Sequence, residues 1–448
     1  MTLPTANAEA NDMGLTDLGI EYGTILLVGS IFVLLLTGQP LAWVTGLVAL
    51  VFTFGWFGGN ALPLVTARIF GFITEYSLVA IPMFILMAAL LDRSGIAKDL
   101  FNGMRVLAGR LPGGVAVQTL IVATLMAAMS GVIGGEIVLL GILALPQMLR
   151  LGYDRDLSIG VVCAGGSLGT MMPPSIVLII YGLVASVSIA DLFVAAVTPA
   201  LMLLGCYIAY VLVRCFRNPD LGPPISAEER AEETIGSAIR SLIAPVFIVV
   251  AVLGSIYGGI ASITEAAALG VSSVLIIALL RRELNARMLQ DSLVHTLETC
   301  GMIIWIGIAA AVLVGVYNLM GGNRFVSAVM LGLDASPVAV ILIMMLILLV
   351  LGMFLDWIGI ALLTLPIFVP IVVQLGYDPI WFGILFAVNM QVSYLTPPFG
   401  PAAFYLKSVA PPNISLGNIY GALLPFIVLQ LFVLAILLFF PGIATWML

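Results

Sequence analysis

The chain has 448 residues, of which 62% are hydrophobic and only 9% are charged. So few charges cannot cover the surface of a water-soluble domain, and a mean hydropathy of +1.22 predicts a polytopic α-helical membrane protein. One histidine and four scattered cysteines exclude a histidine-based zinc or haem site and a disulfide framework. The net charge of −7 identifies no partner, and we expect none among nucleic acids.

The chain begins with a polar, acidic segment over residues 1–20, which lacks the basic start of a cleavable signal peptide. Two landmarks then recur: LGYD at 151–154 returns at 375–378, and Pro173-Pro174 returns as Pro397-Pro398. Both recur after 224 residues, which is half of the chain. The sequence therefore predicts a first repeat over 21–215, a cytoplasmic connector over 216–240 and a second repeat over 241–448.

Each predicted repeat contains the same elements in the same order. Long apolar stretches over 112–150 and 336–375 are interrupted midway by glycines or an acid, so we expect re-entrant hairpins there. Proline-broken helices follow over 157–187 and 379–409, and the other apolar runs give about five spans per repeat. Residues 281–300 have apolar positions at helical spacing and predict a separate interfacial helix.

The basic residues predict the orientation of the repeats. If the ends of the first hairpin are cytoplasmic, 14 of the 16 lysines and arginines fall inside, and only Arg68 and Arg324 fall outside. This is the asymmetry of the positive-inside rule. We therefore expect an all-α fold of inverted repeats, each with about five spans and one hairpin, and both termini in the periplasm.

The two broken helices are the candidate site. A proline inside a helix costs about 3 kcal/mol and frees carbonyl groups that lipid cannot satisfy. A kink relieved by neighbouring helices is one explanation. However, these breaks are double, carry hydroxyl groups and occur in both repeats, which indicates a transport site near the membrane midplane. Bare carbonyl and hydroxyl oxygens are ligands that suit Na⁺, so we expect Na⁺ as coupling ion.

Glu136 and Asp356 occupy equivalent positions, each ten residues before the Leu-Pro of its hairpin. Either carboxylate is explained by capping the second half-helix or by binding an ion or a proton, and both explanations stay open. Tyr394, beside the second break, is interpreted as a packing residue. No nucleophile, metal or general-base constellation is present in the sequence, so we expect no enzymatic activity.

Several motifs resemble those of the large membrane subunit of TRAP transporters, the DctM-type permease of the ion transporter superfamily. They read LTGQPLAWVTGLVAL, LVAIPMFILMAALLDRSGIA, GYDRDLSIGVVCAGGSLGTMMPPSIVLIIYG, GIASITEAAALGV, FLDWIGIALLTLPIFVPIV and LTPPFG. The resemblance implies an elevator-type transporter with scaffold and transport domains in the bacterial inner membrane. It also implies a small four-helix membrane subunit and a periplasmic substrate-binding protein as partners.

The resemblance also assigns site residues. The Na⁺ ligands are expected at the hairpin tips and breaks, namely Ser130, Gly131, Gly134, Gly135, Gly169, Thr170, Met172, Pro173, Ser175, Gly352, Asp356, Ser393, Thr396 and Pro397. Substrate contacts are expected at Ser130, Pro174, Ser175, Thr396 and Pro398. The first tip reads SGVIGGE where the family often has Ser-Gly-Ser-Ser, and SYLTPPFG stands where GLLTPPVG is usual. Glycine carbonyls must therefore replace some hydroxyl ligands.

We expect this chain to be the permease of a tripartite, binding-protein-dependent transporter that imports a small organic acid with Na⁺. A stand-alone Na⁺/anion symporter of the divalent-anion type is the alternative, and would transport without partners. A channel is a further alternative, and would show flux that neither saturates nor depends on a co-ion gradient.

Overall fold

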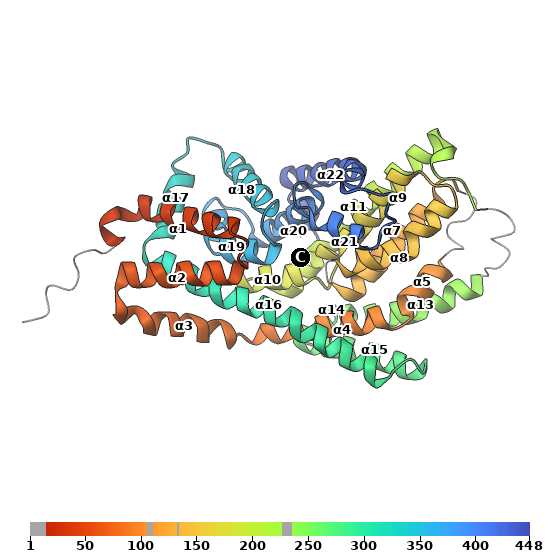
Figure 1. Cartoon of the computed structure of the whole chain (residues 1–448), viewed down its shortest axis with the longest axis horizontal. Helices are drawn as coiled ribbons and strands as arrows, with labels where there is room; N and C mark the ends of the chain where they lie inside the picture. The colour runs from red at the N-terminus through yellow and green to blue at the C-terminus, as the bar shows by residue number, and fades with distance from the viewer. Residues whose placement is uncertain (1–14, 105–110, 132–133, 226–234) are drawn as a thin grey trace, which may run out of the picture. The chain divides into compact units, whose positions relative to one another are not determined.

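The computed structural model describes residues 15–104, 111–131, 134–225 and 235–448, and every regular element within these ranges is a helix (Figure 1). Val132 and Ile133 of the first hairpin tip lie outside them, as do Arg105, Arg110 and Arg230 of the charge count. In the described part of the chain, eight helices are long and apolar enough to cross a membrane: Leu15–Leu36, Tyr76–Arg93, Ile189–Arg217, Ile239–Tyr257, Ile263–Leu280, Ala286–Leu319, Trp357–Gln374 and Leu416–Phe439.

The chain folds into two compact units, and each of them takes segments from both halves of the sequence. The first unit contains Met1–Tyr76, Gly301–Leu342 and Ile358–Leu375, and the second contains Ser77–Cys300, Ile343–Trp357 and Gly376–Leu448. The chain passes from the first unit to the second after Tyr76 and returns after Cys300, which is 224 residues further on.

The first unit is built from α1 and α2 together with the second half of α16. Val48 and Phe52 of α2 pack in one core with Leu27 and Val316, and Thr24 lies within hydrogen-bond distance of Tyr317, at 3.1 Å. The helices of this unit are α1 (Gly19–Leu36), α2 (Leu41–Phe57), α3 (Leu62–Ile73), part of α16 (Ala286–Leu319), α17 (Gly322–Leu331), the start of α18 (Pro337–Gly352) and most of α19 (Trp357–Gln374).

The second unit holds both broken helices. Its helices are α4 (Ala80–Arg93), α5 (Ile96–Gly103), α7 (Gly114–Ser130), α8 (Gly135–Arg150), α9 (Arg155–Ser167), α10 (Ile176–Ala185), α11 (Ile189–Arg217), α13 (Ile235–Val249), α14 (Ser255–Tyr257), α15 (Ile263–Leu280), the first part of α16, the end of α18, α20 (Pro379–Leu395), α21 (Pro401–Val409), α22 (Leu416–Phe439) and α23 (Gly442–Thr445). Within this unit α7, α8 and α9 pack against one another, and α9 also packs against α20 and α22 (Figure 1).

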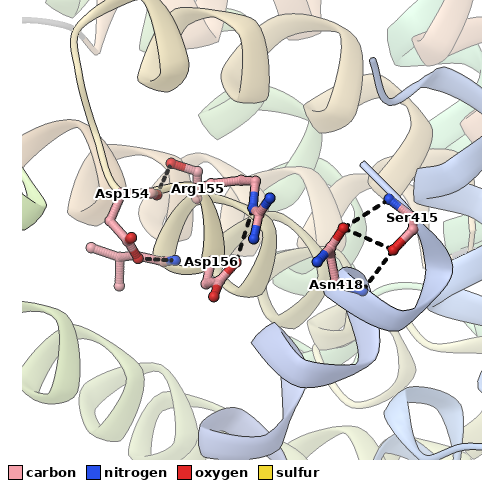
Figure 2. A network of polar contacts seen from close by, with 7 residues as sticks. Asp154, Arg155, Asp156, Ser415 and Asn418 are labelled. Carbon is pink, nitrogen blue, oxygen red and sulfur yellow. Dashed lines mark hydrogen bonds and ion pairs between the residues drawn. The ribbon is translucent and has the colours of Figure 1, made fainter. Parts of the chain in front are cut away.

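The starts of three helices in the second unit follow from capping residues. Asp154 caps α9 by accepting from the Leu157 amide at 2.9 Å, and Asp378 caps α20 by accepting from the Ile380 amide at 2.7 Å. These two caps are the last residues of the repeated LGYD. Ser415 and Asn418 form a capping box at the start of α22 (Figure 2).

The helix expected over residues 281–300 does not end before the next predicted span. Residues Ala286–Leu319 form one continuous helix, α16, because no proline or glycine pair interrupts them after Asn285 caps the first turn. The preceding loop is held by Arg281, which donates to Asp99 and, at 3.0 Å, to Glu283. Partial burial opposes the charge of Arg281, but these bonds outweigh it and raise its pKa.

Candidate functional site

Both proline pairs interrupt helices, and neither lies inside a continuous one. Helix α9 ends at Ser167, a short turn covers Leu168–Thr170, and α10 begins only at Ile176. Helix α20 ends at Leu395 and α21 begins at Pro401. Burial differs between the breaks: residues 169–175 are buried apart from the half-buried Met172, whereas Pro398 and Phe399 are exposed.

The first hairpin tip touches the first break through its backbone. Gly131 has φ +59°, and a Cβ atom built on it would lie 2.0 Å from the carbonyl oxygen of Pro174. The Ile176 amide donates to the Gly131 carbonyl at 3.4 Å. Only glycine permits both this left-handed backbone and this approach. The structure therefore brings together Gly131, Pro174 and Ser175, three of the residues expected from the sequence to bind Na⁺ or substrate.

Glu136 lies where the tip and the break meet. Glu136 is 1% exposed and accepts a hydrogen bond from Ser130 through Oε1, and its Oε2 has no hydrogen-bond partner among the residues that the structure describes. A Cβ atom at Gly169 would lie 3.2 Å from that Oε2. Glu136 is in the first turn of α8, but its carboxylate also contacts the break, so capping alone does not account for its position. A buried carboxylate with an unpaired oxygen is an arrangement that a cation would stabilise.

The serine and threonine hydroxyl groups at both breaks donate hydrogen bonds to neighbouring backbone carbonyl groups. Thr170 donates to the Ser167 carbonyl at 2.9 Å, and Ser175 donates to the Thr170 carbonyl at 2.5 Å. At the second break, Ser393 and Thr396 donate to carbonyl groups four residues earlier, at 3.0 and 2.7 Å. A hydroxyl group whose O–H donates a hydrogen bond keeps free lone pairs on its oxygen, and these lone pairs can bind a cation.

The second hairpin tip differs from the first. Helix α18 ends at Gly352, and Asp356 immediately precedes α19. Asp356 is exposed whereas its counterpart Glu136 is buried, so the two carboxylates are equivalent in sequence but not in environment. The link between this hairpin and the second broken helix is a bond from Asn389 to the Met345 carbonyl at 2.9 Å.

Two groups of residues were missed by sequence reasoning. The first is a central polar cluster of Ser167, Gln391, Gln430 and Tyr207, all fully buried where α9, α20, α22 and α11 meet. Gln391 donates to Ser167 at 3.1 Å, and these two residues are separated by the repeat distance of 224 residues. That separation was a usable signal.

The second group is the pair Tyr394 and Tyr405. Their rings stack with centroids 6.3 Å apart and planes 28° apart. Cζ of Tyr405 would lie 2.9 Å from a Cβ atom at Gly134, so this ring rests on the first hairpin tip. Tyr394 therefore lies next to the first hairpin tip, through its contact with Tyr405. Gly134, Gly135, Met172, Pro173, Pro397 and Pro398 lie at the tips and breaks as expected.

Comparisons with known proteins identify the family. The family model described as "Tripartite ATP-independent periplasmic transporter, DctM component" matches residues 28–443. The isethionate TRAP transporter permease DctMQ of Oleidesulfovibrio alaskensis is 32% identical over 93% of this chain, which spans 65% of that relative's length. The C4-dicarboxylate permease DctM of Vibrio cholerae is 29% identical over 94% of this chain and 96% of its own length. The ectoine permease TeaC of Halomonas elongata is 30% identical over 95% of this chain and 98% of its own length.

Among solved structures, the YdaH transporter of Alcanivorax borkumensis matches with a TM-score of 0.61 at 15% identity, over 86% of this chain and 90% of that one. At this identity the match concerns the fold alone. The family is one of transporters, so this chain is a transport protein and not an enzyme. It belongs to the DctM family, the large permease components of tripartite ATP-independent periplasmic transporters.

Proposed function

We propose that this chain imports a small organic acid by Na⁺ symport, as the large subunit of a transporter with two further components. Those components are a small four-helix membrane subunit and a periplasmic binding protein that delivers the substrate. The contact of Gly131 with Pro174, beside a Glu136 oxygen that has no hydrogen-bond partner in the described ranges, is the observation that carries the proposal. It collects neutral oxygens and one carboxylate around interrupted backbone, a ligand set that suits Na⁺.

The two repeats have opposite orientations in this proposal. Asp154 and Asp378 cap equivalent helices, and Ser167 bonds to its own counterpart Gln391. A residue meets its counterpart only close to the axis that relates two repeats, so α9 and α20 cross near that axis. Where inverted repeats are related by an axis in the membrane plane, the transport site lies at the depth of that axis, near the membrane midplane.

An elevator mechanism is supported by the division into two units. Both breaks and both hairpin tips belong to the second unit, which includes Gly131, Gly352 and Asp356. We assign the second unit as the transport domain and the first as the scaffold. The chain lies in the bacterial inner membrane with both termini in the periplasm, so alkaline phosphatase fused after Leu448 is expected to be active. An inactive fusion at normal expression would reject this topology.

The decisive experiment is uptake into proteoliposomes that contain this chain, its small subunit and its binding protein. Labelled succinate, isethionate and ectoine serve as probes, since relatives carry these classes in their names. Uptake is expected to need an inward Na⁺ gradient and to persist when a proton gradient is collapsed. Uptake that ignores Na⁺ would reject the coupling, and full uptake by this chain alone would favour the stand-alone symporter.

A further inference from the structure

The hydroxyl groups around the two breaks fall into two classes. Ser130, Thr170, Ser175, Ser393 and Thr396 each donate to a carboxylate or carbonyl of the protein. Tyr420 of α22 does the same, at 2.9 Å from the Pro398 carbonyl. A hydroxyl has one proton to donate, so these groups present only oxygen lone pairs to a ligand. They suit a cation but cannot donate to an anion without losing their present bonds.

Tyr394 has a hydroxyl that is still free to donate. Its side chain is 7% exposed, and its OH has no hydrogen-bond partner among the described residues. Leaving a buried hydroxyl unpaired is costly, and natural structures pair most of them. The unpaired OH of Tyr394 therefore needs an explanation, and an acceptor supplied by a ligand gives one.

Tyr405 is the second free donor. No hydrogen bond to its hydroxyl occurs within the described ranges, and its side chain is 42% exposed. The ring stacks on Tyr394 on one side, and its hydroxyl end meets Gly134 of the first tip on the other. The two phenols thus come from both sides of the second break, one from the end of α20 and one from α21.

The charges nearby decide when an anion can bind. The carboxyl groups of Glu136 and Asp92 lie at the first break and the first tip: Oε2 of Glu136 would lie 3.2 Å from a Cβ atom at Gly169, and Oδ2 of Asp92 would lie 3.2 Å from a Cβ atom at Gly135. Lys407, on the same helix as Tyr405, donates to the Ile414 carbonyl at 2.7 Å. An anion here would be repelled until cations neutralise the carboxylates.

We propose that the hydroxyls of Tyr394 and Tyr405 bind the oxyanion group, carboxylate or sulfonate, of the transported acid. The inference rests on the proposed function and assigns its anion contact. The serine and threonine hydroxyl groups then bind Na⁺, and the two tyrosine hydroxyl groups bind the substrate. Na⁺ binds first. The Tyr405 ring must swing off Tyr394 to admit the anion. Ser130, Ser175 and Thr396, expected from the sequence to touch substrate, belong to the cation sites in this assignment.

The test uses the purified full chain and its thermal unfolding. Na⁺ is titrated alone, and then succinate, pyruvate or isethionate is titrated at saturating Na⁺. Both ligands are expected to raise the melting temperature of the wild type. Y394F and Y405F should each raise the half-saturating anion concentration about tenfold or more, since hydrogen bonds to charged groups are strong. The half-saturating Na⁺ concentration should change less than about twofold. If the tyrosines had only a structural role, their loss would weaken Na⁺ binding and anion binding together.

Y181F is the matched control, because Tyr181 is the repeat counterpart of Tyr405 and its hydroxyl is already used, donating to the Pro379 carbonyl at 2.5 Å. It should leave both titrations unchanged. Phenylalanine variants that keep the wild-type anion response, or a wild type that responds to none of the three anions, would overturn the inference. If an anion raises the melting temperature of the wild type without Na⁺, the proposed coupling is refuted. Anion titrations of Y394F and Y405F without Na⁺ would then still decide whether the two tyrosines bind the anion.

Discussion

Gly131→Ala is the sharpest test of the contact between the first hairpin tip and the first break. The added methyl group would lie 2.0 Å from the Pro174 carbonyl oxygen, whereas real Cβ atoms essentially never come within 3.0 Å of another heavy atom. Tip and break must therefore separate by about 1 Å, the difference between these distances. Binding geometries tolerate displacements of about 0.5 Å, so the ligand set around Glu136 should fail.

The size of the effect follows from this displacement. We expect the Na⁺ concentration for half-maximal uptake to rise about 10- to 100-fold, in line with what a misplacement of ~1 Å costs in other sites. A left-handed alanine adds about 1–2 kcal/mol of strain at the same position. The assay is Na⁺ titration of uptake in proteoliposomes, normalised to the amount of protein inserted.

Gly152→Ala separates strain from clash. Gly152 has φ +81°, but its Cβ position is 3.8 Å from the nearest atom, in Pro223. This variant carries the backbone strain without the collision, so its Na⁺ dependence should stay close to wild type. If both variants shift the Na⁺ dependence equally, the tip and the break do not form a cation site together.

Three further predictions concern other parts of the second unit. Thr396→Ala should raise the Na⁺ concentration for half-maximal uptake about tenfold without lowering expression, because in the proposed function the Thr396 hydroxyl oxygen is a Na⁺ ligand. Thr396→Ser should restore the wild-type value, and equal loss of uptake and expression would contradict a ligand role. Arg281→Ala should lower the free energy of unfolding by about 1 kcal/mol, because it removes the bonds to Asp99 and Glu283, and the loss is measured as a lower melting temperature. Arg287→Ala is the control, because the Arg287 side chain is 91% exposed, and it should leave the melting temperature unchanged. Equal effects of the two substitutions would contradict the reasoning. Gln391→Leu should change the free energy of unfolding by less than about 2 kcal/mol, because the lost bond to Ser167 is offset by removing Oε1, a buried oxygen with no hydrogen-bond partner among the described residues. A much larger loss in the same unfolding assay would show that the central polar cluster is fully paired.

The membrane class and the position of the breaks could be read from the sequence, because both depend on local chemistry. A chain with 9% charged residues has few ways to fold in water, and two adjacent prolines stop a helix in any surroundings. The capping residues Asp154 and Asp378 act within the next three residues, so the starts of α9 and α20 are also locally determined. The resemblance of the motifs to the TRAP permeases was confirmed by the family match over residues 28–443.

The helix predicted for residues 281–300 was given the wrong end, because its end is not marked by a local signal. Amphipathic spacing indicates which face of a helix is apolar, but it does not say where the helix ends, and no breaker separates these residues from the next span.

The environments of the polar groups were decided only by tertiary structure. Glu136 and Asp356 occupy equivalent positions in the sequence, yet Glu136 is buried against Gly169 and Asp356 is exposed. The sequence does not show that the Tyr394 hydroxyl is buried with no hydrogen-bond partner in the described part of the chain. Sequence alone determined where the backbone is broken, since proline acts on its own turn. Which oxygens and protons face each break depends on side chains far apart in the chain, and only the packing of the helices brings these together.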